Sequence, residues 1–168
     1  MRDQQRLTER HEFFTRLLET LHKQAPRHFH IADNAIHDAW LCIARYPEGA
    51  DSVGSLNYSF SPASKIYGRP PSFRVEFHID AWGKDGNKKV RDLLHAHRDE
   101  LPQGIGNQIE WDNTDTRGAA QRLAIYYKRP GPILNTSVND PALIPWGVDT
   151  MIRLFEGLDG IWSQLDFS

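Results

Sequence analysis

Hydrophobic and polar residues alternate strictly over residues 74–80, RVEFHID. Because successive side chains of a β-strand point to opposite faces, this pattern predicts a strand with Val75, Phe77 and Ile79 on one face. The other face then carries four ionisable groups in a row: Arg74, Glu76, His78 and Asp80. Such a row suits an acid/base or metal site, and it is equally typical of a half-exposed sheet.

Four further segments have strand character. Residues 40–46 are rich in strand-forming types and are followed by turn residues, and residues 56–61 alternate as cleanly as 74–80. These segments should pair as a meander. Residues 108–112 and 121–128 also alternate, and their closeness in the sequence predicts a late hairpin.

Helical periodicity occurs three times. The first helix is expected to follow Thr8 as its N-cap and to stop at Pro26. The second is expected after the turn at 84–86, with its apolar face reaching Leu101.

The third helix is expected to start at Asp140 and Pro141, a capping residue followed by proline at the first helical position. A break is expected at Pro145, after which the apolar stripe runs on to Trp162.

The order of elements is helix, three strands, helix, two strands, helix. This order predicts an α+β fold: a two-layer sandwich with a mostly antiparallel sheet of about five strands and three helices on one face. A chain of 168 residues buries one substantial core, so residues 1–168 are expected to form a single domain.

Composition narrows the classes of function. The 20 Lys and Arg residues against 22 Asp and Glu residues give a net charge of -2, so binding to nucleic acid would need a local basic patch. Cys42 is the only cysteine, which favours a reducing cytoplasm, and its apolar surroundings in the sequence predict a small buried side chain. No stretch approaches the roughly 20 apolar residues of a membrane span, so a cytoplasmic protein without membrane association is expected.

The predicted sheet has one face free of helices, and that face gathers the polar residues of all its strands. One interpretation is a solvated face with cross-strand ion pairs worth about 0.2 to 1 kcal/mol each. A second is a binding platform in which two arginines, Arg74 and Arg122, clamp an anion. A third is an acid/base or metal site. The face comprises Asn57, Ser59, Arg74, Glu76, His78, Asp80, Glu110, Asp112, Arg122, Tyr126 and Lys128.

Known catalytic patterns are absent from the sequence. A restriction-type nuclease site needs a lysine two residues after an acidic residue, but His78 and Asp112 occupy those positions. No Gly-x-Ser-x-Gly elbow or Gly-Lys-Ser/Thr phosphate loop occurs. His95 and His97 would point about 200° apart on a helix. No catalytic residue, metal or cofactor is therefore predicted, and the five tryptophans are expected to pack in the core.

Seven short segments of the chain form a recognisable set of motifs, at residues 10–14, 54–60, 74–80, 87–88, 109–111, 122–126 and 150–154. Together they resemble a prokaryotic domain family of unknown function, which often follows a restriction-endonuclease-like nuclease domain and sometimes stands alone. They span nearly the whole chain in the same order, although this chain carries an additional proline-bearing segment near residues 62–71. The resemblance implies a helper domain in a restriction or defence setting, and it assigns no catalytic residues.

The leading hypothesis is a non-catalytic binding or assembly module that contacts a nucleic acid or protein partner through the polar sheet face. The alternative is a metal-dependent, nuclease-like hydrolase with Glu76, Asp80 and Glu110 as ligands and His78 as general base. A homodimer formed through an exposed edge strand is also considered. The candidate binding residues are Arg74, Glu76, His78, Asp80, Glu110, Arg122, Tyr126 and Lys128.

Overall fold

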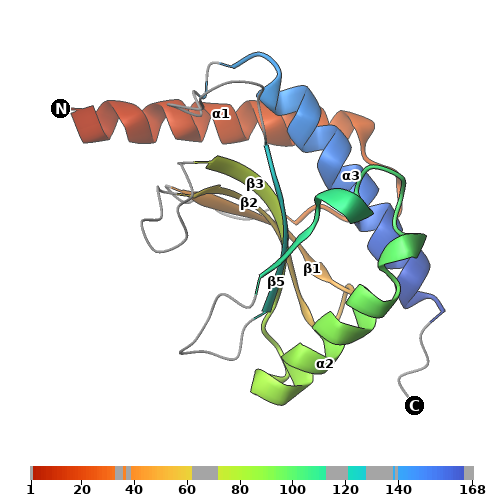
Figure 1. Ribbon diagram of the computed structural model, residues 1–168. Coiled ribbons are helices and arrows are strands. Elements are labelled where there is room, and N and C mark those ends of the chain that lie inside the picture. The colour runs from red at the N-terminus through yellow and green to blue at the C-terminus, as the bar shows by residue number, and fades with distance from the viewer. Residues whose placement is uncertain are drawn as a thin grey trace.

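The helices and strands follow one another in the predicted order (Figure 1). The computed structural model describes residues 2–32, 36, 39–61, 72–112, 121–127, 138 and 140–164. The elements are α1 (Arg2–Gln24), β1 (Trp40–Tyr46), β2 (Gly54–Ser61), β3 (Ser72–Ile79), α2 (Gly83–Ala96), two short 3-10 turns (Arg98–Glu100 and Gly106–Gln108), β4 (Glu110–Asp112), β5 (Gln121–Tyr126) and α3 (Leu143–Trp162).

The strands form one five-stranded sheet in the order β1-β2-β3-β5-β4, and every neighbouring pair is antiparallel. The predicted meander is β1-β2-β3, and the predicted hairpin is β4-β5, which joins the sheet through β5. The register places Glu76 opposite Asn57 on one side and Ala124 on the other. The α+β fold with an antiparallel sheet is thereby confirmed.

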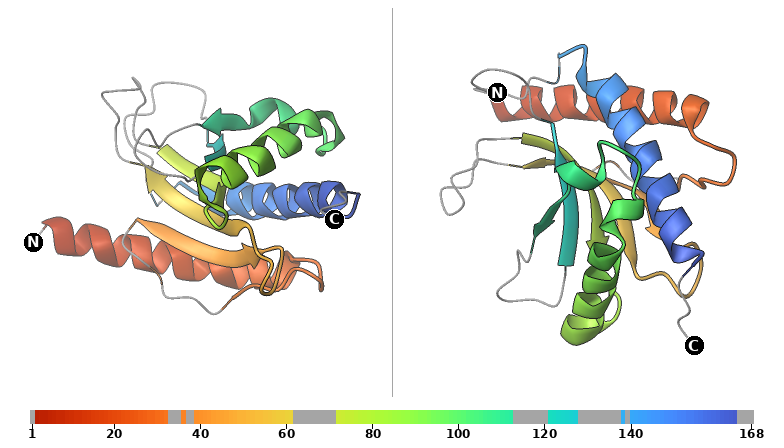
Figure 2. Two further views of the ribbon diagram at one scale, coloured as in Figure 1. Left: turned by 90° about the horizontal axis from the view of Figure 1, so that it is seen from below. Right: turned by 45° about the vertical axis from the view of Figure 1, so that its right-hand side comes forward.

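All three helices pack on one face of the curved sheet, as the views of Figures 1 and 2 show. The ring of Phe13 in α1 lies 5.4 Å from those of Phe60 and Phe73. Farther along the same face, the ring of His95 in α2 lies 4.8 Å from that of Trp111 in β4. The apolar face predicted from alternation is therefore the face that meets the helices.

The first helix begins earlier than predicted. Thr8 was expected to be its N-cap, but α1 starts at Arg2 and the Thr8 hydroxyl donates to the carbonyl of Gln4, 3.1 Å away. A threonine inside a helix makes this bond to the preceding turn, so a capping-type residue does not by itself mark a helix start.

The other two helices also correct the predicted boundaries. Pro145 does not break α3, because it is the third residue of the helix and the amide groups of a first turn have no acceptor within the helix. The second helix ends at Ala96, and a 3-10 turn carries the chain on to Leu101, which still reaches the core.

Two of the five tryptophans do not pack as predicted. Trp40 and Trp82 are 44% and 46% exposed, whereas Trp111, Trp146 and Trp162 pack against the core. None of the helices in the described part of the chain combines the length and apolar character needed to cross a bilayer.

Candidate binding pocket on the open sheet face

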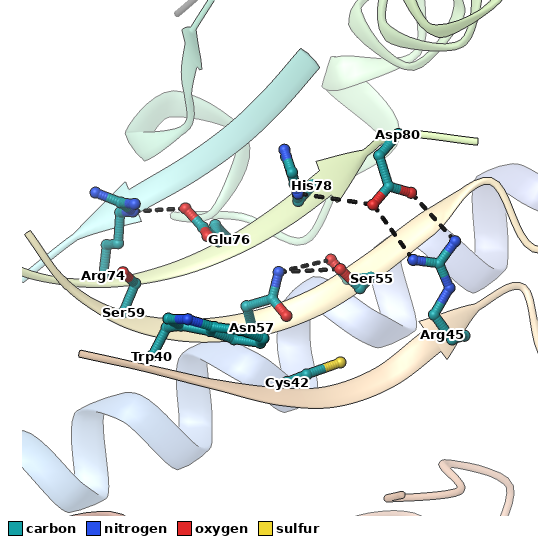
Figure 3. A pocket seen from close by; sticks show the side chains of 10 residues that line it. All are labelled: Trp40, Cys42, Arg45, Ser55, Asn57, Ser59, Arg74, Glu76, His78 and Asp80. Atoms are coloured by element: carbon teal, nitrogen blue, oxygen red, sulfur yellow. Dashed lines mark hydrogen bonds and ion pairs between the residues drawn. The ribbon is translucent and has the colours of Figure 1, made fainter. Parts of the chain in front are cut away.

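The sheet face opposite the helices contains a pocket with a volume of about 450 Å³ (Figure 3). Its walls come from β1, β2 and β3, together with the residue that follows β3. A volume of this size lies in the usual range for small-molecule sites, about 300 to 1,000 Å³. The lining residues are Trp40, Cys42, Arg45, Ser55, Asn57, Ser59, Arg74, Glu76, His78 and Asp80.

Polar side chains at the centre of this face are buried. Asn57, Glu76 and Arg74 are only 5%, 7% and 9% exposed, and Ser55 and Ser59 are buried as well. The interpretation of a solvated face with exposed ion pairs is therefore wrong at the centre of β2 and β3, whereas His78 near the end of β3 is only partly buried. A buried polar group without a hydrogen-bond partner costs free energy, so each hydrogen bond among these side chains affects the stability of the fold.

Glu76 and Arg74 form a buried ion pair. The two residues are separated by two positions on one strand, so their side chains share a face, and Arg74 Nε donates to Glu76 Oε2 at 2.5 Å. Arg122 Nη1 of β5 lies 3.6 Å from the same carboxylate oxygen. The sequence placed these three residues on one face, and the contacts confirm it.

A second, more exposed ion pair lies at the other end of the pocket. Arg45 donates through Nη2 and Nη1 to the two carboxylate oxygens of Asp80, at 3.1 and 3.4 Å. His78 Nδ1 lies 3.9 Å from Asp80. Each lining arginine is thus matched by a lining carboxylate, so the pocket has no strong excess of positive charge.

Asn57 carries a buried acceptor without a hydrogen-bond partner among the described residues. Its amide nitrogen donates to the hydroxyl of Ser55 at 3.1 Å and contacts the Ser55 carbonyl at 3.4 Å. An amide oxygen in that place would be repelled by the carbonyl, which fixes the orientation of the amide. Oδ1 is consequently left unsatisfied, at a cost of about 1 to 3 kcal/mol.

Strand β1 supplies the outer wall. A register shift between Cys42 and Ala44 places both Ile43 and Ala44 in the core and returns Arg45 to the pocket side. Cys42 is half-buried and faces the pocket opposite Asn57, so its predicted place in the core is wrong. Burial raises the pKa of its thiol; the charge of Asp80 raises it further, and that of Arg45 lowers it.

The predicted site residues fall into three groups. Arg74, Glu76, His78 and Asp80 line the pocket, and Arg122 adjoins it. By register, Tyr126 lies opposite Arg74 and Glu110 lies opposite Ala124, so both are on the same sheet face without lining the pocket. Lys128 lies outside the described residues.

Strand β1 contributes to the site although the sequence pattern did not predict it. Trp40, Cys42 and Arg45 all line the pocket, but the extra residue of the bulge disrupts the alternation that would have assigned them to one face. The spacing of two between Trp40 and Cys42 was the available signal that both side chains lie on one face of the strand.

The arrangement of acidic side chains does not support the alternative of a metal-dependent hydrolase. Among the described residues, no three His, Cys, Asp or Glu side chains lie close enough together to hold a metal ion. Glu76 and Asp80 each accept a hydrogen bond from an arginine, and Glu110 is separated from Glu76 by the intervening strand β5. These three acids are not grouped as a set of ligands.

Comparison with known families finds no family that matches this chain, and comparisons with curated proteins and with solved structures find no similar protein. The resemblance to a restriction-associated domain family therefore stays a prediction.

Proposed function

We propose that the protein is a non-catalytic binding module that receives a polar group of a partner molecule in the pocket on its open sheet face. The main support is the buried polar lining, above all the unsatisfied Oδ1 of Asn57. A native protein rarely keeps such a group unless water, an ion or a ligand completes its hydrogen bonds. A ligand that supplies an N–H or O–H donor would recover the free energy now lost.

The charges in the pocket favour recognition of an uncharged group. Arg74 is paired with Glu76, and Arg45 is paired with Asp80. Binding to a phosphate backbone depends on cations that displace counterions, and here each lining arginine already neutralises a carboxylate. The partner, whether nucleic acid or protein, is accordingly expected to insert a neutral polar group.

The restriction or defence setting and a homodimer remain predictions, because both depend on the sequence alone. The proposed function requires only that the pocket binds a polar group of a partner molecule.

NMR spectroscopy of 15N-labelled protein tests this function. The side-chain amide of Asn57 and the indole of Trp40 report directly on the pocket. The probes are mixed-sequence single-stranded DNA and RNA, duplex DNA and a mixture of short peptides. At least one class should shift both signals. Ser59→Phe should abolish the shift by filling the pocket, whereas Ser163→Phe, on an exposed site at the end of α3, should preserve it. The absence of any shift at millimolar probe would refute the proposal.

A further inference from the structure

The lining of the pocket is more polar than that of most small-molecule sites. Such sites are usually lined by apolar and aromatic side chains, with a few polar groups that orient the ligand. Here eight of the ten lining residues are polar or charged, and the two exceptions are Trp40 and Cys42. A ligand that suits this lining carries many hydrogen-bonding groups and a limited apolar surface.

The charges of the lining residues balance. Arg45 and Arg74 are accompanied by Asp80 and Glu76, and each arginine is paired with one of the two carboxylates. A charged group of a ligand would compete for one partner of such a pair and leave the other charge uncompensated. The pocket therefore favours a ligand without charge.

Several hydrogen-bonding positions of the lining are not used within the described part of the chain. Arg74 binds Glu76 through Nε alone, and Glu76 receives both arginine contacts on Oε2. His78 contacts Asp80 through Nδ1 alone. The terminal nitrogens of Arg74, Oε1 of Glu76 and Nε2 of His78 are thus donors and acceptors spread over the pocket. A hydroxyl group suits each of them, because it both donates and accepts.

Trp40 supplies the one aromatic surface of the lining. The residue is 44% exposed where it stands, and in Figure 3 its indole extends along the sheet beside Asn57. The face of an aromatic ring is weakly negative and attracts C–H groups. A flat ring that carries C–H groups on one face can therefore pack on the exposed part of this indole.

The two ends of the pocket are far apart. The register puts Trp40 in one row with Arg74, and it puts Arg45 in one row with His78. Arg74 and His78 are four residues apart on β3, which corresponds to about 13 Å at about 3.3 Å per residue. This span exceeds the width of a single six-membered ring, so a ligand that reaches both ends contains at least two linked rings.

We propose that the pocket binds an uncharged oligosaccharide of at least two sugar rings, an inference that rests on the proposed binding function. A sugar ring is neutral, has a rim of hydroxyl groups and presents C–H groups on its flat face. One ring would pack on Trp40 near Arg74, and the next would extend toward His78 and Asp80 at the other end of the pocket.

Nucleic acids and peptides fit the pocket less well. A nucleic acid carries a negative charge on every phosphate, and its binding depends on cations that are not already neutralised. An extended peptide gains its main-chain hydrogen bonds at the edge of a sheet, whereas this pocket lies on the face of the sheet.

NMR titration with neutral disaccharides tests the inference, with the signals of Asn57 and Trp40 as reporters. Cellobiose, maltose, lactose and diacetylchitobiose are added to the DNA, RNA and peptide probes. At least one disaccharide at about 20 mM should shift both signals, as expected for a Kd in the millimolar range or below. Sorbitol, which carries hydroxyl groups on an open chain without a ring, should shift neither.

Two variants test the two ends of the pocket. Trp40→Ala should reduce the affinity for the bound disaccharide at least about tenfold. Trp82→Ala is the matched control, since Trp82 is equally exposed and does not line the pocket. His78→Ala should weaken binding several-fold by removing a contact to the second ring. An otherwise unchanged amide spectrum of each variant shows that its fold is intact.

The outcomes separate this inference from the proposed function. An unchanged affinity in Trp40→Ala, or an equal shift with sorbitol, would overturn the oligosaccharide assignment. If no disaccharide shifts the two signals while DNA, RNA or peptides do, the oligosaccharide is excluded and the binding function stands. If none of these probes shifts them, both proposals fail.

Discussion

Replacing Glu76 with glutamine provides the sharpest test of how the pocket is built. Glu76→Gln keeps the size of the side chain and removes its charge. Arg74 and Arg122, which lie 2.5 and 3.6 Å from Oε2, would then face an uncharged amide. The exposed fractions of the Glu76 and Arg74 side chains are 9% and 11%, so water can compensate little of this loss.

The expected cost follows from that burial. Removing one partner of a buried ion pair destabilises a protein by about 3 to 5 kcal/mol, because the remaining charge is left uncompensated. Some residual exposure and the hydrogen bond that glutamine can still accept place the estimate near the lower end, at about 3 kcal/mol. For a chain of this size, about 3 kcal/mol corresponds to a decrease in Tm of roughly 6 to 12 °C.

Urea unfolding measures the change, with an unchanged slope against urea showing that the loss is one of stability. The matched control is Asp92→Asn on α2, whose exposed ion pairs with Lys88 and Arg91 should together contribute no more than about 1 kcal/mol. A loss for Glu76→Gln no larger than that of this control would show that the carboxylate is effectively in water and that the ion pair is not buried as described.

Three further predictions concern other parts of the molecule. Gly157→Ala should destabilise the fold by about 1 to 3 kcal/mol, since the added Cβ would lie 2.7 Å from Pro102. Gly160→Ala in the same helix places its Cβ where no atom lies within 4 Å, and it should stabilise the fold by about 0.5 to 1 kcal/mol. Urea unfolding of both variants measures the two changes. Cys42 should be alkylated more slowly than a free thiol at pH ~8, because burial raises its pKa, and an alkylation rate matching glutathione would contradict this. Burial also raises the pKa of Tyr58 well above 10.0. The neutral hydroxyl therefore stabilises the fold below pH ~10, and this contribution is lost as the pH rises further. Urea unfolding at pH ~8 and ~11 should show a smaller alkaline loss for Tyr58→Phe than for the wild type.

The faces of the sheet could be predicted because alternation is a local property. Val75, Phe77 and Ile79 are fully buried beneath the helices, and Arg74 and Glu76 lie on the other face, as their positions in the sequence require. The identity of the strands and their antiparallel pairing followed from the same signal together with short connections.

The pocket could not be predicted, because it depends on contacts between strands. Alternation places Asn57 and Glu76 on one face without revealing that they are directly opposite, and it says nothing of their burial. The bulge of β1 hides the contribution of Trp40 and Cys42. The ends of the helices could not be predicted from single residues either. Thr8 lies inside α1 without starting it, and Pro145 lies in the first turn of α3 without breaking it.

The packing of α1 against α3 has a consequence for the order in which the chain folds. The last residue of α1 is Gln24 and the last of α3 is Trp162, a difference of 138 positions. At about 5 to 20 residues per second, synthesis of that span takes roughly 7 to 28 s. Phe13 can meet Phe60 and Phe73 earlier, but α1 completes its apolar contacts only when the final helix has left the ribosome. The nascent chain therefore spends many seconds with an unfinished hydrophobic surface, during which a chaperone has time to bind.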